Sequence, residues 1–212
     1  MIDVANIEEF FKGKQERLQK LENNLRRDNL LVASELSNSE RLLASEMVEA
    51  GILKSIDQRI FTTKKFPIND FLIRQLVLGQ GIYYGNTALY LWQLSDSFPY
   101  TVELAVRMGY QVPEKRYPDW TKNVQFRQVR EPHLSTDVER ITVPNTQRTI
   151  KIYSPERVLV EMIKQTHSDK EIFKQGLQGY LKSPQRNLSK LMSVARRLNA
   201  AEKVQEIVGV VL

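Results

Sequence analysis

The chain contains no cysteine and only two histidines, His133 and His167, among its 212 residues. Without cysteine it can form no disulfide, no thiolate metal site and no cysteine nucleophile, and two histidines leave little for metal or base chemistry. It has no run of about 18 apolar residues, so the sequence predicts no membrane-spanning helix and no membrane partner. The N-terminus also lacks the basic and apolar regions of a signal peptide. We therefore expect a cytoplasmic protein.

The composition is that of a globular protein with an anionic partner. Hydrophobic residues make up 42% of the chain and charged residues 26%, which argues against extended disorder. The length fits one large domain or two small ones, because domains span roughly 100–200 residues. Residues 1–66 hold 11 basic and 11 acidic side chains, so the net charge of +6 comes entirely from residues 67–212. A basic surplus of this kind indicates an attraction to anions such as nucleic acid.

Residues 1–66 begin with two predicted helices. Apolar side chains recur at helical spacing over residues 7–25, and Gly13 within them is expected to break or kink the helix. A second, short helix is expected over residues 30–35.

A third helix and a hairpin follow. Ser37 and Glu40 have the spacing of a capping box, so a helix is expected to start there. It should run to Ala50 and end at Gly51, because glycine suits a left-handed cap. In residues 52–62, two short β-prone runs flank a polar turn, which predicts a hairpin. Three helices followed by a hairpin predict a winged helix-turn-helix domain.

The polar side of the third helix carries the chemistry expected of a DNA-binding helix. Its side chains lie opposite Leu43 and Met47 and offer a guanidinium, an amide, a hydroxyl and a methyl-bearing group. These groups can contact base edges and thymine methyls in the major groove. Basic residues of the hairpin are expected to contact phosphate, which positions a protein without specifying sequence. A small helical bundle with a polar surface would give the same pattern. The candidate DNA-binding residues are Asn38, Arg41, Ser45, Val48, Lys54, Gln58 and Arg59.

Residues 67–212 predict a second, mixed α/β domain that ends in helices. Helical patterns cover residues 68–94, strand patterns lie between about 100 and 153, and a helical pattern continues over residues 155–209. A Ser-Pro pair at residues 154–155 marks the start of the last helical region. The fold class expected for the whole chain is therefore α+β.

A basic face is predicted on the C-terminal helices, opposite an apolar stripe that includes Leu188 and Leu191. A solvated surface without a partner would look the same. Reversing Arg186, Lys190 and Arg197 to glutamate is expected to leave the fold intact, because surface substitutions usually cost about 0.5 kcal/mol or less each. The face consists of Lys182, Arg186, Lys190 and Arg197.

The sequence offers no convincing catalytic constellation. His167 and Asp169 are one arm of a metal site at most, because no second cluster of ligands has suitable spacing. Glu156 and Glu161 lie about 140° apart on a predicted helix, so they cannot easily act on one proton. A glycine-rich phosphate loop is absent. We therefore expect no enzyme activity, no cofactor and no metal.

Several segments together resemble the AbiEi antitoxins of type IV toxin–antitoxin, or abortive-infection, systems. Residues 47–61 resemble the helix and wing of that family, and residues 82–94 resemble its Tyr-x-x-x-x-Ala-Leu-x-Leu-x-x-Leu core. Residues 152–157 match its Tyr-x-x-Glu-Arg motif, and residues 173–181 and 187–191 match its terminal helices. The resemblance covers about residues 20–212. The chain departs from the family pattern at Trp92, Gln93, Val158 and Glu161.

The resemblance implies a transcriptional autorepressor that binds inverted repeats in its own promoter. It also implies an antitoxin that counteracts a nucleotidyltransferase-like toxin, AbiEii, without a stable complex, through the C-terminal domain. Two alternatives remain open at this point. One is a winged-helix regulator whose second domain senses a small ligand or a protein. The other is an RNA-binding module that uses the basic C-terminal helices.

Overall fold

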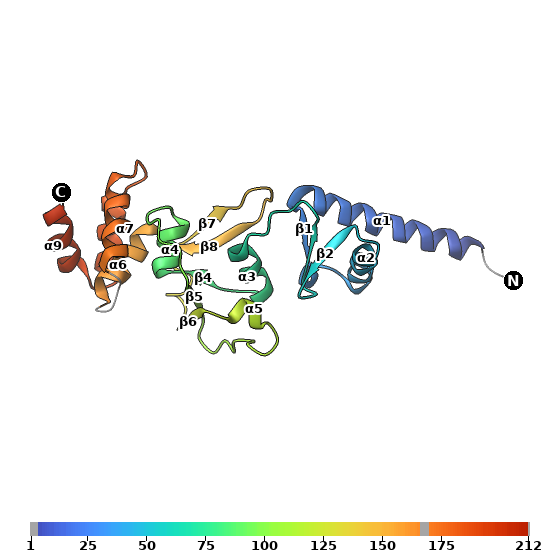
Figure 1. Ribbon diagram of the computed structural model, residues 1–212, viewed down its shortest axis with the longest axis horizontal. Helices are drawn as coiled ribbons and strands as arrows, with labels where there is room; N and C mark the ends of the chain where they lie inside the picture. Colours follow the sequence, from blue (N-terminus) through green and yellow to red (C-terminus); the bar gives the residue numbers. More distant parts are fainter. Residues whose placement is uncertain (1–3, 166–169, 212) are drawn as a thin grey trace. The chain divides into compact units, whose positions relative to one another are not determined.

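The computed structural model describes residues 4–165 and 170–211 and has an α+β fold (Figure 1). The α+β class expected from the sequence is confirmed. Helices form the N-terminal and C-terminal parts of the described chain, and the strands between them form two separate sheets. The N-terminal elements are α1 (Val4–Asp28), β1 (Leu30–Val32), the 3-10 turn η1 (Ala33–Glu35), α2 (Asn38–Glu49), β2 (Leu53–Ile56) and β3 (Ile60–Thr63).

Two features of the first part of the chain differ from what the sequence pattern suggests. Helix α1 continues through Gly13 without a break, because a single glycine costs a helix only about 1 kcal/mol. The short helix expected over residues 30–35 is instead strand β1 followed by η1. Asn29, with a φ of 56°, ends α1 and turns the chain. All three residues of β1 are buried, and Leu31 lies opposite Phe61 of β3, so sheet pairing decides the local structure here.

The expected hairpin is present as β2 and β3, which pair antiparallel. Asp57 and Gln58 both have positive φ angles, 49° and 54°, and the Arg59 N–H donates to the Ile56 carbonyl at 3.0 Å. This geometry is that of a type I′ turn, which matches the twist of the two strands. Strand β1 joins the other edge of β3, so the sheet order is β1-β3-β2. The core beneath it consists of Leu21, Leu31, Ala33, Leu36, Leu43, Ala44, Leu53 and Phe61.

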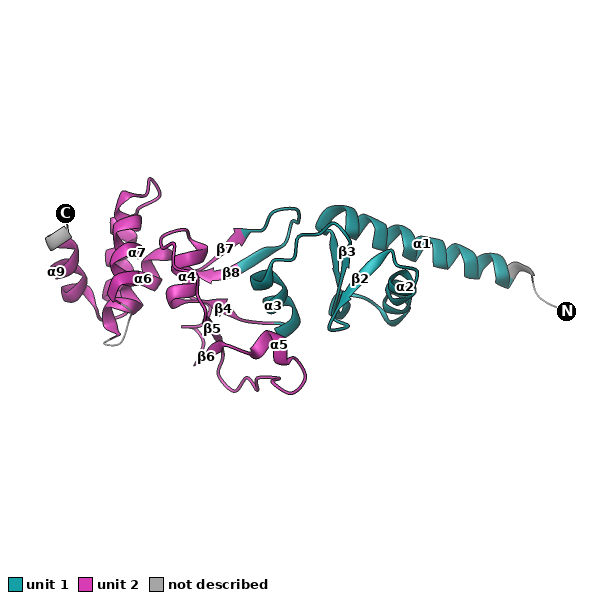
Figure 2. Cartoon of the chain, in the orientation of Figure 1, with its two compact units in different colours: residues 1–79, 142–150 teal, residues 80–141, 151–212 magenta. Residues whose placement is uncertain are grey.

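The chain divides into two compact units, shown in Figure 2. Unit 1 comprises residues 1–79 and 142–150, and unit 2 comprises residues 80–141 and 151–212. The sequence pattern predicts a domain boundary after residue 66 instead. The difference arises because α3 (Asp70–Leu78) packs against β3 and belongs to unit 1. The loop that contains Arg148 also belongs to unit 1, since this guanidinium pairs with Asp28 and Glu35 at 3.0 and 2.6 Å.

Unit 2 is built around a five-stranded sheet with the order β6-β5-β4-β8-β7. Its first strand, β4, is not predicted by the sequence pattern, because it has only two residues. Strands are present between residues 102 and 153, where the sequence pattern predicts them. The elements that precede the last helices are β4 (Ile82–Tyr83), α4 (Gly85–Leu91), β5 (Val102–Arg107), α5 (Pro118–Thr121), β6 (Val124–Val129), β7 (Val138–Thr142) and β8 (Thr149–Tyr153).

Helix α6 is the centre of the C-terminal helical segment. It begins after Ser154, whose hydroxyl accepts the N–H of Arg157, and Pro155 occupies the first turn, as the sequence predicts. Most of its residues are buried, since it packs against α4, α7, α8 and α9. The last helices are α6 (Pro155–Lys164), α7 (Lys170–Lys182), α8 (Leu188–Arg197) and α9 (Ala201–Val211).

Candidate functional site

Helix α2 is held in unit 1 by a capping box and an ion pair. The Ser37 hydroxyl accepts the N–H of Glu40 at 3.3 Å, and the Glu40 carboxylate accepts the N–H of Ser37 at 2.8 Å. Lys20 of α1 lies 2.7 Å from the same carboxylate. The hydrogen bond with Lys20, followed by that with the Ser37 backbone, lowers the pKa of Glu40 to about 2. These contacts fix the N-terminal end of α2 against α1.

Most of the predicted polar side of α2 faces solvent. Asn38 and Arg41 are exposed, and Ser45 is half-buried. The Arg41 Nε donates to the Leu36 carbonyl at 3.2 Å, and the Ser45 hydroxyl donates to the Arg41 carbonyl at 3.0 Å. The guanidinium therefore stays at the N-terminal end of the helix. In helix-turn-helix proteins this end of the recognition helix contacts the bases.

Val48 does not belong to this exposed side, because it packs against the core of unit 1. Leu42 takes the outward position instead, with 64% of its surface exposed. The buried side of α2 is centred on Leu43 and Ala44 and also includes Glu40. It therefore differs from the side that a helical wheel of the apolar residues alone predicts to be buried. The expectation that Val48 faces outward is therefore wrong, and an apolar contact group on this surface is supplied by Leu42.

The hairpin residues differ in what they contact. Lys54 on β2 is exposed, and so is Gln58 in the turn. Arg59, in contrast, is half-buried, and its Nη1 donates to the Val77 carbonyl at 3.1 Å. Of the three predicted hairpin contacts, Lys54 and Gln58 are thus presented to solvent, whereas the guanidinium of Arg59 helps to hold α3 on the sheet.

The Tyr-x-x-Glu-Arg motif lies in the core of unit 2. The Arg157 guanidinium is buried over the ring of Tyr153, 3.5 Å from its centroid. It donates to the carbonyls of His133 and Thr136 and to the carboxylate of Glu161, the last at 2.9 Å. Arg157 thus joins the loop before β7 to helix α6. These contacts explain an arginine in the first turn of a helix, where the dipole alone would disfavour it.

A second, half-buried arginine continues this polar network across the sheet. Arg127 of β6 pairs with Glu161 at 2.6 Å and lies 4.0 Å from the ring centroid of Tyr84. Glu103 of β5 accepts the N–H groups of Asn86 and Thr87 at the start of α4. Burial raises the pKa of Glu103, and burial together with the Glu103 charge raises that of Tyr84 to about 12. The network ties α4 to the sheet through Glu103 and α6 to the sheet through the ion pair of Arg127 and Glu161.

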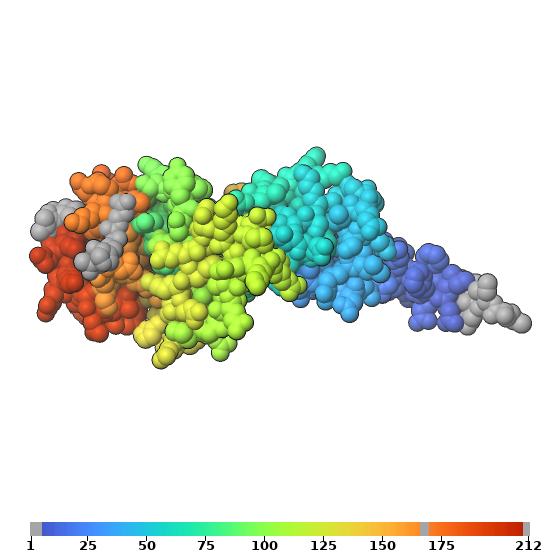
Figure 3. Space-filling view, turned by 60° about the horizontal axis from the view of Figure 1, so that its bottom comes forward, coloured from blue at the N-terminus to red at the C-terminus, as the bar shows by residue number. Residues whose placement is uncertain are grey.

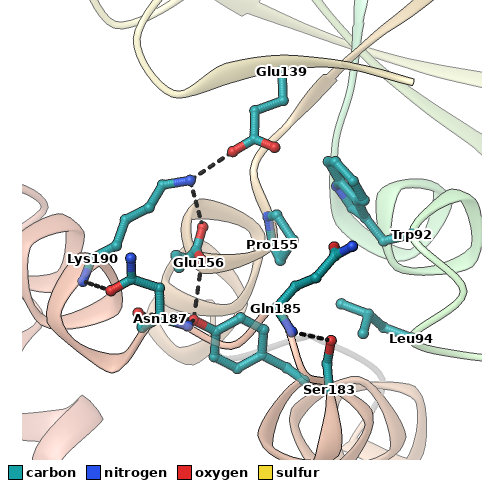
Figure 4. A pocket seen from close by; sticks show the side chains of 10 residues that line it. Trp92, Leu94, Glu139, Pro155, Glu156, Ser183, Gln185, Asn187 and Lys190 are labelled. Atoms are coloured by element: carbon teal, nitrogen blue, oxygen red, sulfur yellow. Dashed lines mark hydrogen bonds and ion pairs between the residues drawn. The ribbon is translucent and has the colours of Figure 1, made fainter. Parts of the chain in front are cut away.

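A pocket of about 180 Å³ lies next to this network, between α4, β7 and the ends of α6, α7 and α8 (Figure 4). Lys190 points into it, with its ammonium 2.6 Å from Glu139 and 3.0 Å from Glu156. The hydroxyl of Tyr180 lies 3.0 Å from the other oxygen of Glu156 and accepts the N–H of Asn187 at 2.8 Å. Burial lowers the pKa of Lys190, but the hydrogen bonds with both glutamates outweigh it and raise that pKa overall. The lining residues are Trp92, Leu94, Glu139, Pro155, Glu156, Tyr180, Ser183, Gln185, Asn187 and Lys190.

The predicted basic face of the C-terminal helices is divided by these contacts. Lys190 is engaged in the pocket, and Arg197 pairs with Asp137. Arg186 is exposed, although its Nη1 donates to the Leu181 carbonyl at 2.8 Å, and Lys182 is also exposed. The assumption that these side chains are simply solvated is therefore wrong for Lys190 and Arg197. Reversing their charges would place carboxylates beside carboxylates.

Histidine contributes little to any site in the described part of the chain. His133 is exposed, whereas His167 and Asp169 lie outside the described residues. Within residues 4–165 and 170–211, no group of three or more His, Asp or Glu side chains could hold a metal ion. None of the helices described is both long enough and apolar enough to cross a membrane.

The sequence was also compared with known proteins. No protein-family model matches it, and no curated protein does.

Proposed function

We propose that unit 1 is a winged helix-turn-helix domain that binds double-stranded DNA, with α2 as its recognition helix. The observation that carries this proposal is the order α1-β1-η1-α2-β2-β3 together with the sheet order β1-β3-β2. This order of helix, strand, turn, helix and hairpin is typical of winged helices. The single 3-10 turn η1 takes the place of the second helix. It leaves α2 packed across α1 with its polar side outward.

The proposed contacts follow from the exposed groups of unit 1. Arg41 and Asn38 offer a guanidinium and an amide, which form bidentate hydrogen bonds with guanine and adenine. Leu42 is placed to contact a thymine methyl group. Lys54 and Gln58 on the hairpin contact phosphate or sugar groups and fix the register. Because residues 1–66 have equal numbers of basic and acidic groups, non-specific binding by this unit is weak and base contacts matter more.

The resemblance to AbiEi antitoxins supplies the biological role that we propose. The protein represses its own promoter in the cytoplasm and counteracts a nucleotidyltransferase-like toxin encoded beside it, without forming a stable complex with it. The antitoxin activity belongs to unit 2, where the cations that remain at the surface include Lys182, Arg186 and Arg196. Lys190 and Arg197 support this surface through their ion pairs.

Binding to promoter DNA tests the proposal. Fluorescence anisotropy would compare a duplex from the promoter upstream of this gene with a scrambled duplex of equal composition. We expect affinity for the promoter to exceed that for the scrambled duplex by about 10³-fold or more at physiological salt. Equal affinity for both duplexes would contradict sequence-specific binding. Co-expression with the neighbouring toxin gene, scored by growth, separately tests the antitoxin role.

A further inference from the structure

Helix α1 carries an apolar stripe of which only one half is covered. Leu21 and Leu25 pack into the core of unit 1. The other half consists of exposed side chains at helical spacing along the same side of the helix. The first part of α1 projects beyond the rest of unit 1 (Figure 3). We call these residues the α1 stripe, and they are Ile7, Phe10, Phe11 and Leu18, with exposed fractions of 42%, 61%, 62% and 39%.

We propose that the α1 stripe pairs two copies of this chain, with their α1 helices antiparallel and crossing near Phe10 and Phe11. The area of the stripe supports pairing. Two phenylalanines exposed to this degree leave roughly 250 Å² of aromatic surface in water, and their rings already contact each other edge to face. A standard interface buries roughly 800 Å² per partner, so the stripe and its neighbours suit a modest, reversible dimer.

The charges beside the stripe favour a second copy as the occupant. On the helical wheel, Glu8 borders it on one side and Arg17 on the other, so its border has no net charge. Lys14 falls within the stripe on the helical wheel, but its ammonium is paired with Glu46 of α2 at 3.2 Å. Lys20, on another side of the helix, is paired with Glu40 at 2.7 Å. A neutral border suits an identical neutral surface related by a two-fold axis. It does not suit nucleic acid or an anionic membrane, which attract basic helices.

The position of the core fixes the antiparallel direction. From Leu21 onward the same side of α1 is covered by the chain's own β1 and α2. A parallel partner helix in register would occupy that space. In an antiparallel pair with residue 11 opposite residue 11, residues 4–18 of the two helices lie opposite each other, short of Leu21. Each exposed stripe can therefore be covered without displacing the core.

Sedimentation equilibrium of the full chain without DNA, over about 1–100 μM, tests the pairing. We expect a monomer–dimer equilibrium in this range. Phe10→Asp combined with Phe11→Asp should raise the dissociation constant of the dimer about 100-fold or more, because aromatic anchors dominate such interfaces. The matched control is Phe98→Asp with Tyr100→Asp, which introduces the same charges at exposed aromatic residues of unit 2. This control should leave the dissociation constant of the dimer unchanged. A purely monomeric wild-type chain, or equal effects of the two double variants, would overturn the proposal.

Introduced cysteines report the direction of the helices, since the natural chain has none. Phe11→Cys should form a disulfide-linked dimer under mild oxidation, whereas Leu18→Cys should not, because antiparallel pairing separates the two copies of residue 18. Linkage through Leu18→Cys would overturn the antiparallel arrangement. Binding to a single half-site separates this inference from the proposed function. A dimer that binds no DNA contradicts only the DNA-binding role, and a monomer that binds a half-site contradicts only the pairing.

Discussion

Replacing Lys190 by glutamate is expected to destabilise unit 2 strongly, although the residue belongs to a basic, partly exposed helix. Its ammonium lies between Glu139 and Glu156, and Glu156 is only 3% exposed. Removing one partner of a buried ion pair costs about 3–5 kcal/mol, whereas exposed pairs contribute at most about 1 kcal/mol. Because 37% of the Lys190 side chain is exposed, we expect a loss of about 2–4 kcal/mol in the free energy of unfolding.

Urea unfolding followed by circular dichroism measures this loss. Arg196→Glu is the matched control, since it makes the same charge reversal at an exposed position of α8 and should change stability by about 0.5 kcal/mol or less. Equal stabilities of the two variants at neutral pH would refute the structural role given to Lys190.

Three further predictions concern other contacts. The pKa of Glu40 is lowered from 4.5 to about 2. The stabilisation of the folded state by its carboxylate is therefore present above pH 4.5 and is lost as the pH falls toward 2. Glu40→Gln should therefore cost about 1–2 kcal/mol at neutral pH and less in acid, as acid titration of unfolding would show. Lys54→Ala should weaken binding to all DNA sequences alike and reduce the slope of log affinity against log salt by about 0.9, measured by anisotropy. Gly85→Ala should cost about 1–3 kcal/mol in thermal unfolding, because φ is +56° and a Cβ would collide with the carboxylate of Glu103.

Local signals predicted the features of unit 1 that depend on a few neighbouring residues. The capping box of Ser37 and Glu40 and the hairpin after Gly51 are present because their hydrogen bonds form within the segment itself. Strand β1 could not be predicted in this way. Its three aliphatic residues are compatible with a helix, and only pairing with β3 makes them a strand. Long-range contacts therefore determine the structure of residues 30–32, for which the local pattern predicts a helix.

The candidate sites show the same limit. A helical wheel orders the side chains of one helix but does not reveal which neighbours pack on it, so it placed Val48 outward and gave no partner for Lys190 or Arg197. Their partners Glu139 and Asp137 lie 51 and 60 residues earlier in the chain, on or beside β7. No local pattern connects residues so far apart. The Tyr-x-x-Glu-Arg motif marked an important segment, but the contacts of Arg157 depend on the folded loop before β7.

The affinity of Arg41→Ala for the promoter duplex tests the central claim most directly. The matched control is Arg107→Ala, which removes the same charge from an exposed position in unit 2. We expect Arg41→Ala to weaken promoter binding by about 1–3 kcal/mol and to relax specificity at one base pair, while Arg107→Ala leaves both unchanged. Circular dichroism should show that both variants remain folded. Unchanged promoter affinity of a folded Arg41→Ala variant would contradict the placement of α2 in the major groove.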